Sequence, residues 1–264
     1  MYLEYWGLTK FPFENVADPY FFYLSESHEE ALSRLLYGSR MRKGGVMLTG
    51  DIGCGKTMVS KVYTNKLMEE GYGVILLTNP PLGPVEFLQE ILYQQGVEKL
   101  PDSRTKLLQL LNKHMVYNME QNKETIVIID EAQILNEETF EEARLLLNFQ
   151  NKDRFFLTLV LIGQNELKAK ISHIAQLYQR IAIRYHLRPF HFLDTAKYIL
   201  FREKKAGLTR NIFTTEAIKQ VYEYSQGVPR KVNSVCDLSL LVAFNKKRKV
   251  IDSGMIKSVV DDLR

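Results

Sequence analysis

The sequence contains few cysteines and no long apolar run. Its two cysteines, Cys54 and Cys236, are too few for the disulfide framework on which small secreted domains depend. No apolar stretch approaches the roughly 18 residues that a membrane-spanning helix needs, so no transmembrane segment is predicted in this chain. Residues 1–6 have neither the basic nor the apolar region of a signal peptide. These absences predict a protein of a reducing, cytoplasmic compartment.

The patterns of several site classes are also missing. The five histidines show no metal-ligand spacing, and no nucleophile cluster, internal repeat or low-complexity linker is present. What remains is ordinary globular composition: 264 residues, of which 45% are hydrophobic and 25% are charged. That length supports a sizeable core, and we expect one large domain with a smaller one.

The sequence does contain the pattern G-x-x-x-x-G-K-[ST] at residues 50–57, which is typical of the phosphate-binding loop of nucleoside triphosphatases. Glycines let the backbone wrap around phosphate oxygens, Lys56 would place its charge between the outer phosphates, and the Thr57 hydroxyl would hold Mg²⁺. A strand predicted at Val46–Thr49 precedes the loop and a helix follows it, so the phosphates would lie at a helix N-terminus. The residues predicted to bind ATP are Gly50, Asp51, Gly53, Cys54, Gly55, Lys56 and Thr57.

A second pattern is the apolar run Ile126–Ile129, which is followed by Asp130 and Glu131. The carboxyl ends of strands in a doubly wound sheet face the ligand. Asp130 would reach Mg²⁺, usually through water, and Glu131 would orient and deprotonate the attacking water. The alternative is an acidic loop without a function, which the presence of a phosphate loop disfavours.

A polar amide follows the next predicted strand, Thr158–Ile162. Gln164 can donate a hydrogen bond to the γ-phosphate or to the attacking water, and we prefer it over Asn165. A loop amide that only caps the following helix is the alternative.

Three arginines are candidates for contact with bound nucleotide. Arg180, preferred over Arg184, is predicted to reach the γ-phosphate of a neighbouring subunit, where an arginine raises the rate by about 10³–10⁵. Arg230 lies on the first turn of a helix that Pro229 opens, and it would point back to the nucleotide. The alternatives are a surface salt bridge or a solvated side chain, which contribute little.

The order of apolar runs predicts an α/β fold with a doubly wound parallel sheet, because short buried runs alternate with helical patterns. The predicted strands are Val46–Thr49, Val74–Thr78, Ile126–Ile129 and Thr158–Ile162, and the predicted helices are Met58–Glu69, Ser103–Glu120 and Glu137–Asn148. After about residue 190 only helical patterns remain, with caps predicted at Asp194, at Thr214 or Thr215, and at Asp252 or Ser253.

Two domains are therefore expected. Residues 1–190 are predicted to form the nucleotide-binding α/β domain, and residues 191–264 a small α-helical domain. The first 25 residues are rich in Tyr, Phe, Trp and Pro, and we expect this aromatic segment to pack on the sheet domain near the adenine.

Charge is distributed unevenly, although the net charge is only +4. Residues 1–170 hold 18 Lys and Arg against 23 Asp and Glu, a net charge of −5, whereas residues 171–264 hold 17 against 8, a net charge of +9. A basic C-terminal third could face nucleic acid or an anionic membrane, or its arginines could serve ATP in an oligomer. A basic run such as Lys246 to Lys249 is usually a solvated helix end, and contact with nucleic acid or lipid is the alternative.

These motifs, in this order, resemble those of AAA+ ATPases, and the details resemble one branch, the general secretion pathway A-component or ExeA-like ATPases. Matching stretches include residues 2–8, 23–28, 145–149, 161–164, 179–189 and 227–230. The resemblance implies a P-loop AAA+ domain followed by a helical lid, with ATP and Mg²⁺ as cofactors. It also implies hydrolysis at Asp130 and Glu131, sensing at Gln164 and Arg230, and activation by Arg180 across subunits of a ring or filament.

Two features depart from that branch. Its secretion members often continue into a membrane span and a peptidoglycan-binding domain, so we expect either a shorter, pilus-associated relative or a fragment. Cys54 stands where Thr is more usual, at a position that chiefly contributes backbone.

We expect an ATP-driven assembly factor for an envelope secretion or pilus machine. The alternative is a DNA-binding regulator similar to the TnsC-type transposition ATPases, which the +9 charge of residues 171–264 favours. A third possibility, a nucleotide-gated scaffold that does not hydrolyse ATP, is disfavoured by Glu131.

Overall fold

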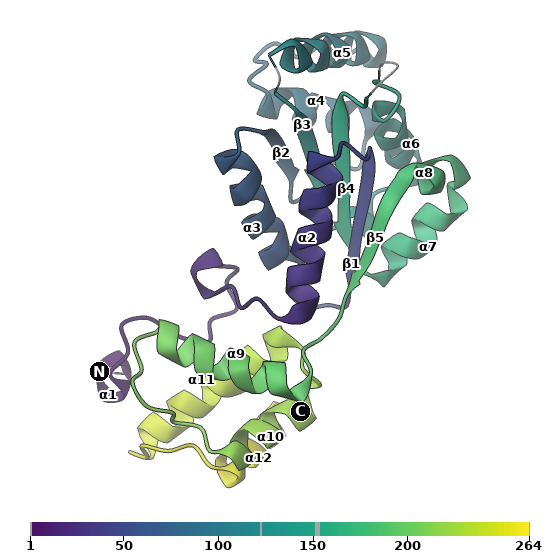
Figure 1. Ribbon diagram of the computed structural model, residues 1–264. Helices are drawn as coiled ribbons and strands as arrows, with labels where there is room; N and C mark the ends of the chain where they lie inside the picture. The colour runs from purple at the N-terminus through teal and green to yellow at the C-terminus, as the bar shows by residue number, and fades with distance from the viewer. Residues whose placement is uncertain (1, 122, 151–153, 264) are drawn as a thin grey trace. The chain divides into compact units, whose positions relative to one another are not determined.

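The computed structural model describes residues 2–121, 123–150 and 154–263 (Figure 1). Contacts between Cα atoms divide the chain into two compact units. We call residues 29–51 and 59–187 the sheet unit, and residues 1–28, 52–58 and 188–264 the helical unit. Each unit has its own apolar core.

Five parallel strands form the sheet, in the order β2-β3-β4-β1-β5 (Figure 1). They are β1 (Gly45–Gly50), β2 (Gly73–Leu77), β3 (Thr125–Ile129), β4 (Leu157–Gly163) and β5 (Ile181–Leu187). The four predicted strands are confirmed, and every residue of β1, β3 and β4 is buried. Strands buried on both faces give continuous apolar runs, which is why they were visible in the sequence.

The strand β5 was not predicted. It lies at the edge of the sheet beside β1, and its exposed residues Ala182, Arg184 and His186 alternate with more buried ones. An edge strand of this kind has no continuous apolar run, so periodicity alone does not separate it from a loop.

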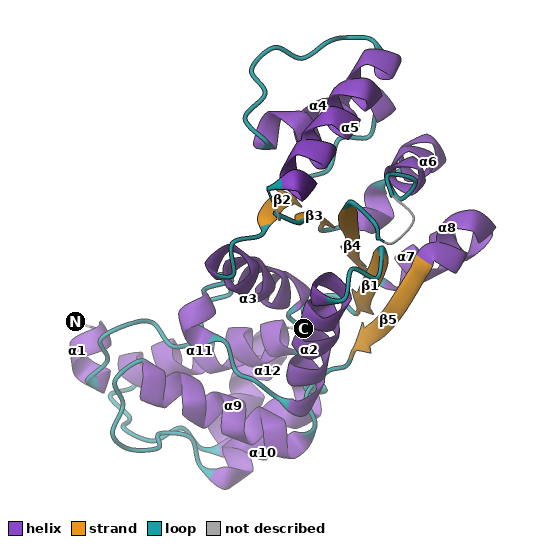
Figure 2. Cartoon of the chain, turned by 45° about the horizontal axis from the view of Figure 1, so that its top comes forward, coloured by secondary structure: helices purple, strands orange, loops and turns teal. Residues whose placement is uncertain are grey.

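Helices cover both faces of the sheet, as the doubly wound prediction requires (Figure 2). Met47, Val127 and Leu159 face a core shared with the helices α4 to α8, whereas Val46 faces Gly38 of α2 on the other side. Successive strand residues point to opposite faces, which separates these two sets. The helices are α2 (Glu26–Arg40), α3 (Lys56–Glu69), α4 (Pro84–Gln94), α5 (Arg104–Glu120), α6 (Glu137–Leu146), α7 (Asn165–His173) and α8 (Ala175–Arg180), with a 3-10 turn, η2, at Ala132–Ile134.

The helical unit contains α9 (Phe192–Lys205), α10 (Thr215–Ser225), α11 (Pro229–Asn245) and α12 (Ser253–Asp262). Two caps agree with prediction: the Thr214 side chain accepts from the N–H of Ala217, and the Asp252 side chain accepts from the N–H of Met255. The cap predicted at Asp194 is wrong, because α9 begins after His191. Asp194 lies in the first turn instead, where a carboxylate is favoured by the helix dipole.

The aromatic N-terminal segment packs with these helices, and not on the sheet as predicted. It forms α1 (Tyr2–Trp6) and a 3-10 turn, η1 (Pro19–Phe21), and its side chains Trp6, Phe13 and Phe21 are buried in the core of the helical unit. The Thr9 N–H donates to the Ala206 carbonyl at 2.8 Å. Composition marks such a segment as packed, but it does not reveal which apolar surface covers it.

The described residues contain no helix that is both long and apolar enough to cross a membrane.

One buried acid in the helical unit lacks full hydrogen bonding. Glu203 of α9 is 2% exposed; its Oε1 accepts from the Ile212 N–H at 3.4 Å, and its Oε2 has no partner among the described residues. Burial raises the pKa of Glu203 from 4.5 to about 7. The buried Cys236 thiol is near enough for the charge of Glu203 to raise the thiol pKa, and Arg202 and Asp237 also act on that thiol.

Stability should therefore depend on pH through Glu203. Since the folded-state pKa is raised, its stabilising contribution is present below about pH 4.5 and is lost as pH rises through about 7. We expect Glu203→Gln, which stays neutral, to unfold a few degrees above the wild type at pH 8 and near it at pH 5. Thermal unfolding at both pH values measures this, with the exposed Glu223→Gln as control. Equal pH slopes in wild type and Glu203→Gln would contradict it.

Candidate functional site

The carboxyl ends of three neighbouring strands bring predicted site residues to one edge of the sheet (Figure 1). Gly50 ends β1 and is followed by Asp51; Asp130 follows β3, and Gln164 follows β4. Asp51 Oδ1 accepts from Asn165 Nδ2 at 2.6 Å, which links the ends of β1 and β4. Gly50 has to be small, because a Cβ there would lie 2.9 Å from the Leu187 carbonyl oxygen.

Glu131 lies at the centre of an amide network. Its Oε2 accepts from Gln164 Nε2 at 3.3 Å and from Gln133 Nε2 at 2.5 Å. The backbone of Glu131 is left-handed, with φ 52 and ψ 34, a conformation that non-glycine residues adopt rarely and at some cost. A strained backbone that aims a carboxylate into a pair of amides is typical of a functional position.

Gln133 was missed by the sequence reasoning. Its Nε2 donates to Glu131, and its Oε1 accepts from the Gln164 N–H at 3.0 Å, so the side chain bridges β3 and β4. Gly163 leaves room for it, because a Cβ there would lie 2.5 Å from Gln133 Oε1. The signal available in the sequence was only a polar residue two positions after the acids, which by itself is common.

Asp130 is buried, with 3% of its surface exposed, and one of its oxygens accepts from the Glu131 N–H at 2.9 Å. Thr57 lies in the first turn of α3 and is exposed. A carboxylate and a hydroxyl are hard oxygen donors of the kind that Mg²⁺ prefers, so the chemistry of these two side chains fits the predicted ion.

Residues 52–58, which hold most of the phosphate loop, belong to the helical unit by their contacts, whereas Gly50 and Asp51 belong to the sheet unit. Gly53 and Gly55 have left-handed φ values of 82 and 98, which favour glycine. Lys56, at the start of α3, is 6% exposed. The Arg230 N–H donates to the Gly53 carbonyl at 3.2 Å, so the first turn of α11 lies against the loop, while the Arg230 side chain is exposed.

The two candidate trans-acting arginines make contacts within the sheet unit. Arg180 is half-buried, and its Nη1 donates to the Leu147 carbonyl at 2.7 Å. Arg184 is exposed and stacks on Tyr178, with 3.6 Å from the guanidinium carbon to the ring centroid. A guanidinium has five N–H donors, so the contact of Arg180 leaves it able to bind more.

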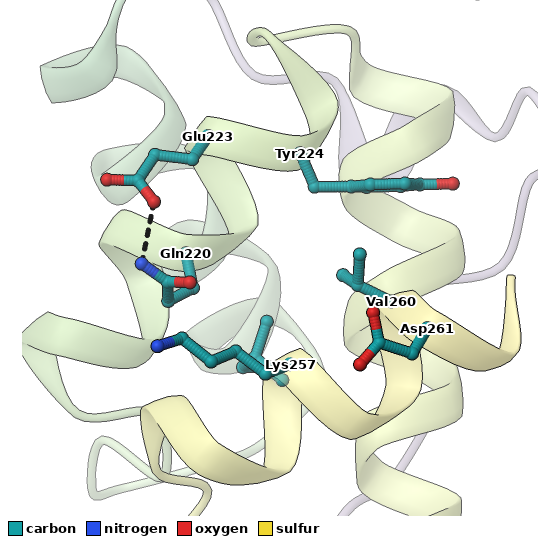
Figure 3. A pocket seen from close by; sticks show the side chains of 7 residues that line it. Gln220, Glu223, Tyr224, Lys257, Val260 and Asp261 are labelled. Carbon is teal, nitrogen blue, oxygen red and sulfur yellow. Dashed lines mark hydrogen bonds between the residues drawn. The ribbon is translucent and has the colours of Figure 1, made fainter. Parts of the chain in front are cut away.

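A hollow of about 250 Å³ opens elsewhere, between α10 and α12 of the helical unit (Figure 3). It is lined by Gln220, Glu223, Tyr224, Ile256, Lys257, Val260 and Asp261. None of the predicted site residues lines it, and Gln220 is already bonded to Glu223 at 2.6 Å. We assign it no function.

Two curated proteins are similar in sequence to half or more of this chain. It is 37% identical to the general secretion pathway protein A of Aeromonas hydrophila over 259 residues, which is 97% of this chain and 47% of that protein. It is 28% identical over 144 residues to the ATP-dependent target DNA activator B of Escherichia phage Mu, 52% of this chain and 42% of that one. The chain thus spans about half the length of the curated relatives it matches. The resemblance to the secretion A-component branch is confirmed.

Solved structures with the same fold are more distant in sequence. The ORC2 protein of Aeropyrum pernix has a TM-score of 0.69 at 18% identity, covering 95% of this chain and 71% of its own. A Drosophila ORC structure with DNA bound has a TM-score of 0.69 at 16% identity, covering 97% and 66%. A RuvB of Thermotoga maritima has a TM-score of 0.61 at 17% identity, covering 89% and 70%. These similarities confirm the P-loop AAA+ fold.

A family described as AAA domain matches residues 39–171, about half of the chain, which include both the phosphate loop and the acidic strand end. With its motifs, sheet and fold in agreement, the chain belongs to this AAA domain family.

Proposed function

We propose that this protein binds ATP and hydrolyses it, with Glu131 as the general base. The observation that carries the proposal is the amide network at the sheet edge. Gln133 and Gln164 both donate to one oxygen of Glu131, which orients the carboxylate at the carboxyl end of β3, in the same parallel sheet as β1. An ordered carboxylate of this kind can take the proton from a water that attacks phosphorus.

The other site residues have supporting roles in this proposal. The backbone of Gly50, Asp51, Gly53, Cys54 and Gly55 cradles the phosphates, and Lys56 neutralises them. Gln164 senses the γ-phosphate, and Arg230 approaches the nucleotide from α11. Thr57 and Asp130 hold Mg²⁺, which would neutralise charge on the phosphate oxygens.

We further propose that the active form is an oligomer, a ring or a filament, in which Arg180 completes the site of a neighbour. Arg180 lies in the last turn of α8, before the edge strand β5, and its guanidinium keeps donors beyond the bond to Leu147.

Specific ATPase activity should then rise with protein concentration. Arg180→Ala subunits mixed with Lys56→Ala subunits should recover some hydrolysis, because an intact Lys56 site can receive Arg180 from its neighbour. Phosphate release from each variant alone and from the mixture measures this. Turnover that does not depend on concentration, together with no gain on mixing, would favour a monomeric ATPase.

We propose that this protein is cytoplasmic and that its biological role is to support a bacterial envelope secretion or pilus machine. It rests on the similarity to general secretion pathway protein A, of which the chain spans 47%. Cys54 and Cys236 are both buried and neither is in a disulfide, which fits a reducing compartment.

A second candidate, a DNA-binding regulator of transposition, has its own support. The phage Mu relative is named as an activator of target DNA, and residues 171–264 carry a net charge of +9. The run Lys246 to Lys249 follows α11, but Lys249 already donates to the Tyr5 carbonyl at 2.7 Å and covers the Tyr5 ring.

DNA binding across a salt series separates the two candidates. A DNA-binding protein should lose affinity by about 0.9 log units per phosphate contact for each decade of salt, and alanines at residues 246–249 should flatten that slope. For a secretion factor we expect weak binding at physiological salt and no effect of DNA on ATP turnover. Fluorescence anisotropy, paired with ATPase assays with and without duplex DNA, measures both. Tight binding with strong stimulation would rule out the secretion role.

A further inference from the structure

A buried histidine lies against the phosphate loop. His28, in the first turn of α2, is 3% exposed. Its Nε2 is 3.1 Å from the carbonyl oxygen of Cys54, and its Nδ1 is 2.8 Å from the hydroxyl of Ser25. A carbonyl can only accept, so Nε2 carries the proton, and Nδ1 accepts from Ser25.

The ring is neutral and confined. Burial lowers the pKa of His28 to about 4, so at neutral pH it acts as a hydrogen-bond donor and not as a charge. Phe190 and Phe22 pack around it, with ring centroids at 5.2 and 6.1 Å. The Ser25 hydroxyl is itself buried, which leaves the imidazole a single tautomer in this setting.

The phosphate loop is shaped to this ring. A Cβ at Gly55 would lie 2.9 Å from His28 Nε2, and Gly55 also has a left-handed φ of 98. Gly55 is therefore required twice, by its backbone and by the imidazole beside it. The Cys54 side chain is fully buried, so its carbonyl sits where water cannot readily replace a lost partner.

We propose that His28 is a positioning residue for nucleotide binding, which holds the phosphate loop open toward the phosphates from its outer side. Successive N–H groups of such a loop face the anion, so carbonyls between them face away and need partners. The imidazole supplies that partner at Cys54, between the two left-handed glycines Gly53 and Gly55. This inference rests on the proposed ATP site, and it assigns a function to the first turn of α2.

Two substitutions of His28 separate donation from mere packing. At position 28, the amide nitrogen of a glutamine would lie about where Nε2 of the imidazole lies, and the amide nitrogen of an asparagine about where Nδ1 lies. We expect His28→Gln to keep the dissociation constants for ATP and ADP within about threefold, and His28→Asn to weaken both about tenfold. Turnover at saturating ATP should change little in either variant, because the loop binds phosphates and does not supply the base.

Calorimetry with ATP and ADP, together with KM and kcat, measures these effects, and thermal unfolding reports the structural cost. Wild-type affinity in His28→Asn would overturn the inference. An equal loss in both variants that follows their loss of stability would also overturn it, since it would indicate packing alone.

Ser25→Ala is a milder variant that keeps the ring. It removes the hydroxyl that donates to Nδ1 and should weaken ATP binding about threefold. Unchanged ATP affinity in Ser25→Ala would contradict the inference even if the His28 variants fail to fold. Lys56→Ala is measured in parallel. Unchanged ATP affinity in Lys56→Ala would reject the ATP site itself, whereas loss there with no effect at His28 and Ser25 would reject only the positioning role.

Discussion

Glu131→Gln should lower ATP turnover by about 10²–10⁴-fold while ATP still binds. The amide keeps the shape of the side chain but cannot take the proton of the attacking water. In the wild type, Gln133 and Gln164 donate to the Glu131 carboxylate, so the substitution also weakens the orientation of this side chain. Phosphate release measures the turnover, calorimetry the affinity, and size-exclusion chromatography the ATP-bound oligomer that we expect to accumulate.

A matched control is Glu166→Gln, which changes an exposed acid in the first turn of α7. It makes the same chemical change at an acid of the sheet unit that none of the hydrogen bonds of the amide network involves, and its turnover should equal that of the wild type. Wild-type hydrolysis in Glu131→Gln would show that another residue is the base.

Lys56→Ala should weaken ATP binding by at least about a hundredfold, because charge-assisted hydrogen bonds to phosphate are among the strongest that a side chain makes. Lys56 follows the two left-handed glycines and begins α3, so its ammonium group and the helix N-terminus would act on the same anion. Calorimetry with ATP measures the affinity, and circular dichroism checks that the protein stays folded.

The control for Lys56→Ala is Lys66→Ala, in the last turn of the same helix and exposed. It removes the same charge without touching the loop, and ATP affinity should not change. If Lys56→Ala binds ATP like the wild type, the loop is not the nucleotide site and the proposed function fails.

The parts of the fold that were predictable are those with a local cause. The strands β1, β3 and β4 are buried along their whole length, so each appears as an unbroken apolar run. The caps at Thr214 and Asp252 use a side chain three residues from its partner, which is visible in any sequence. The loop at residues 50–57 needs glycine and lysine at set spacings for the same reason.

The strand β5 and the N-terminal segment were not predictable in this way. The polar, exposed residues of β5 become a strand only because β1 offers an unpaired edge. The aromatic residues of the N-terminal segment indicated burial, but the choice of the helical unit over the sheet depends on which apolar surface is left uncovered.

By itself, the sequence determined which chemical groups this protein contains: a phosphate loop, two acids after a buried strand, and arginines in the basic residues 171–264. Only the tertiary structure decided which groups meet. Gln133 bridges Glu131 and Gln164 because β3 and β4 are neighbours in the sheet, and His28 reaches Cys54 across 26 residues of chain. Spacing along a chain sets local contacts, whereas these hydrogen bonds depend on strand order and on the packing of distant segments, which no local pattern specifies.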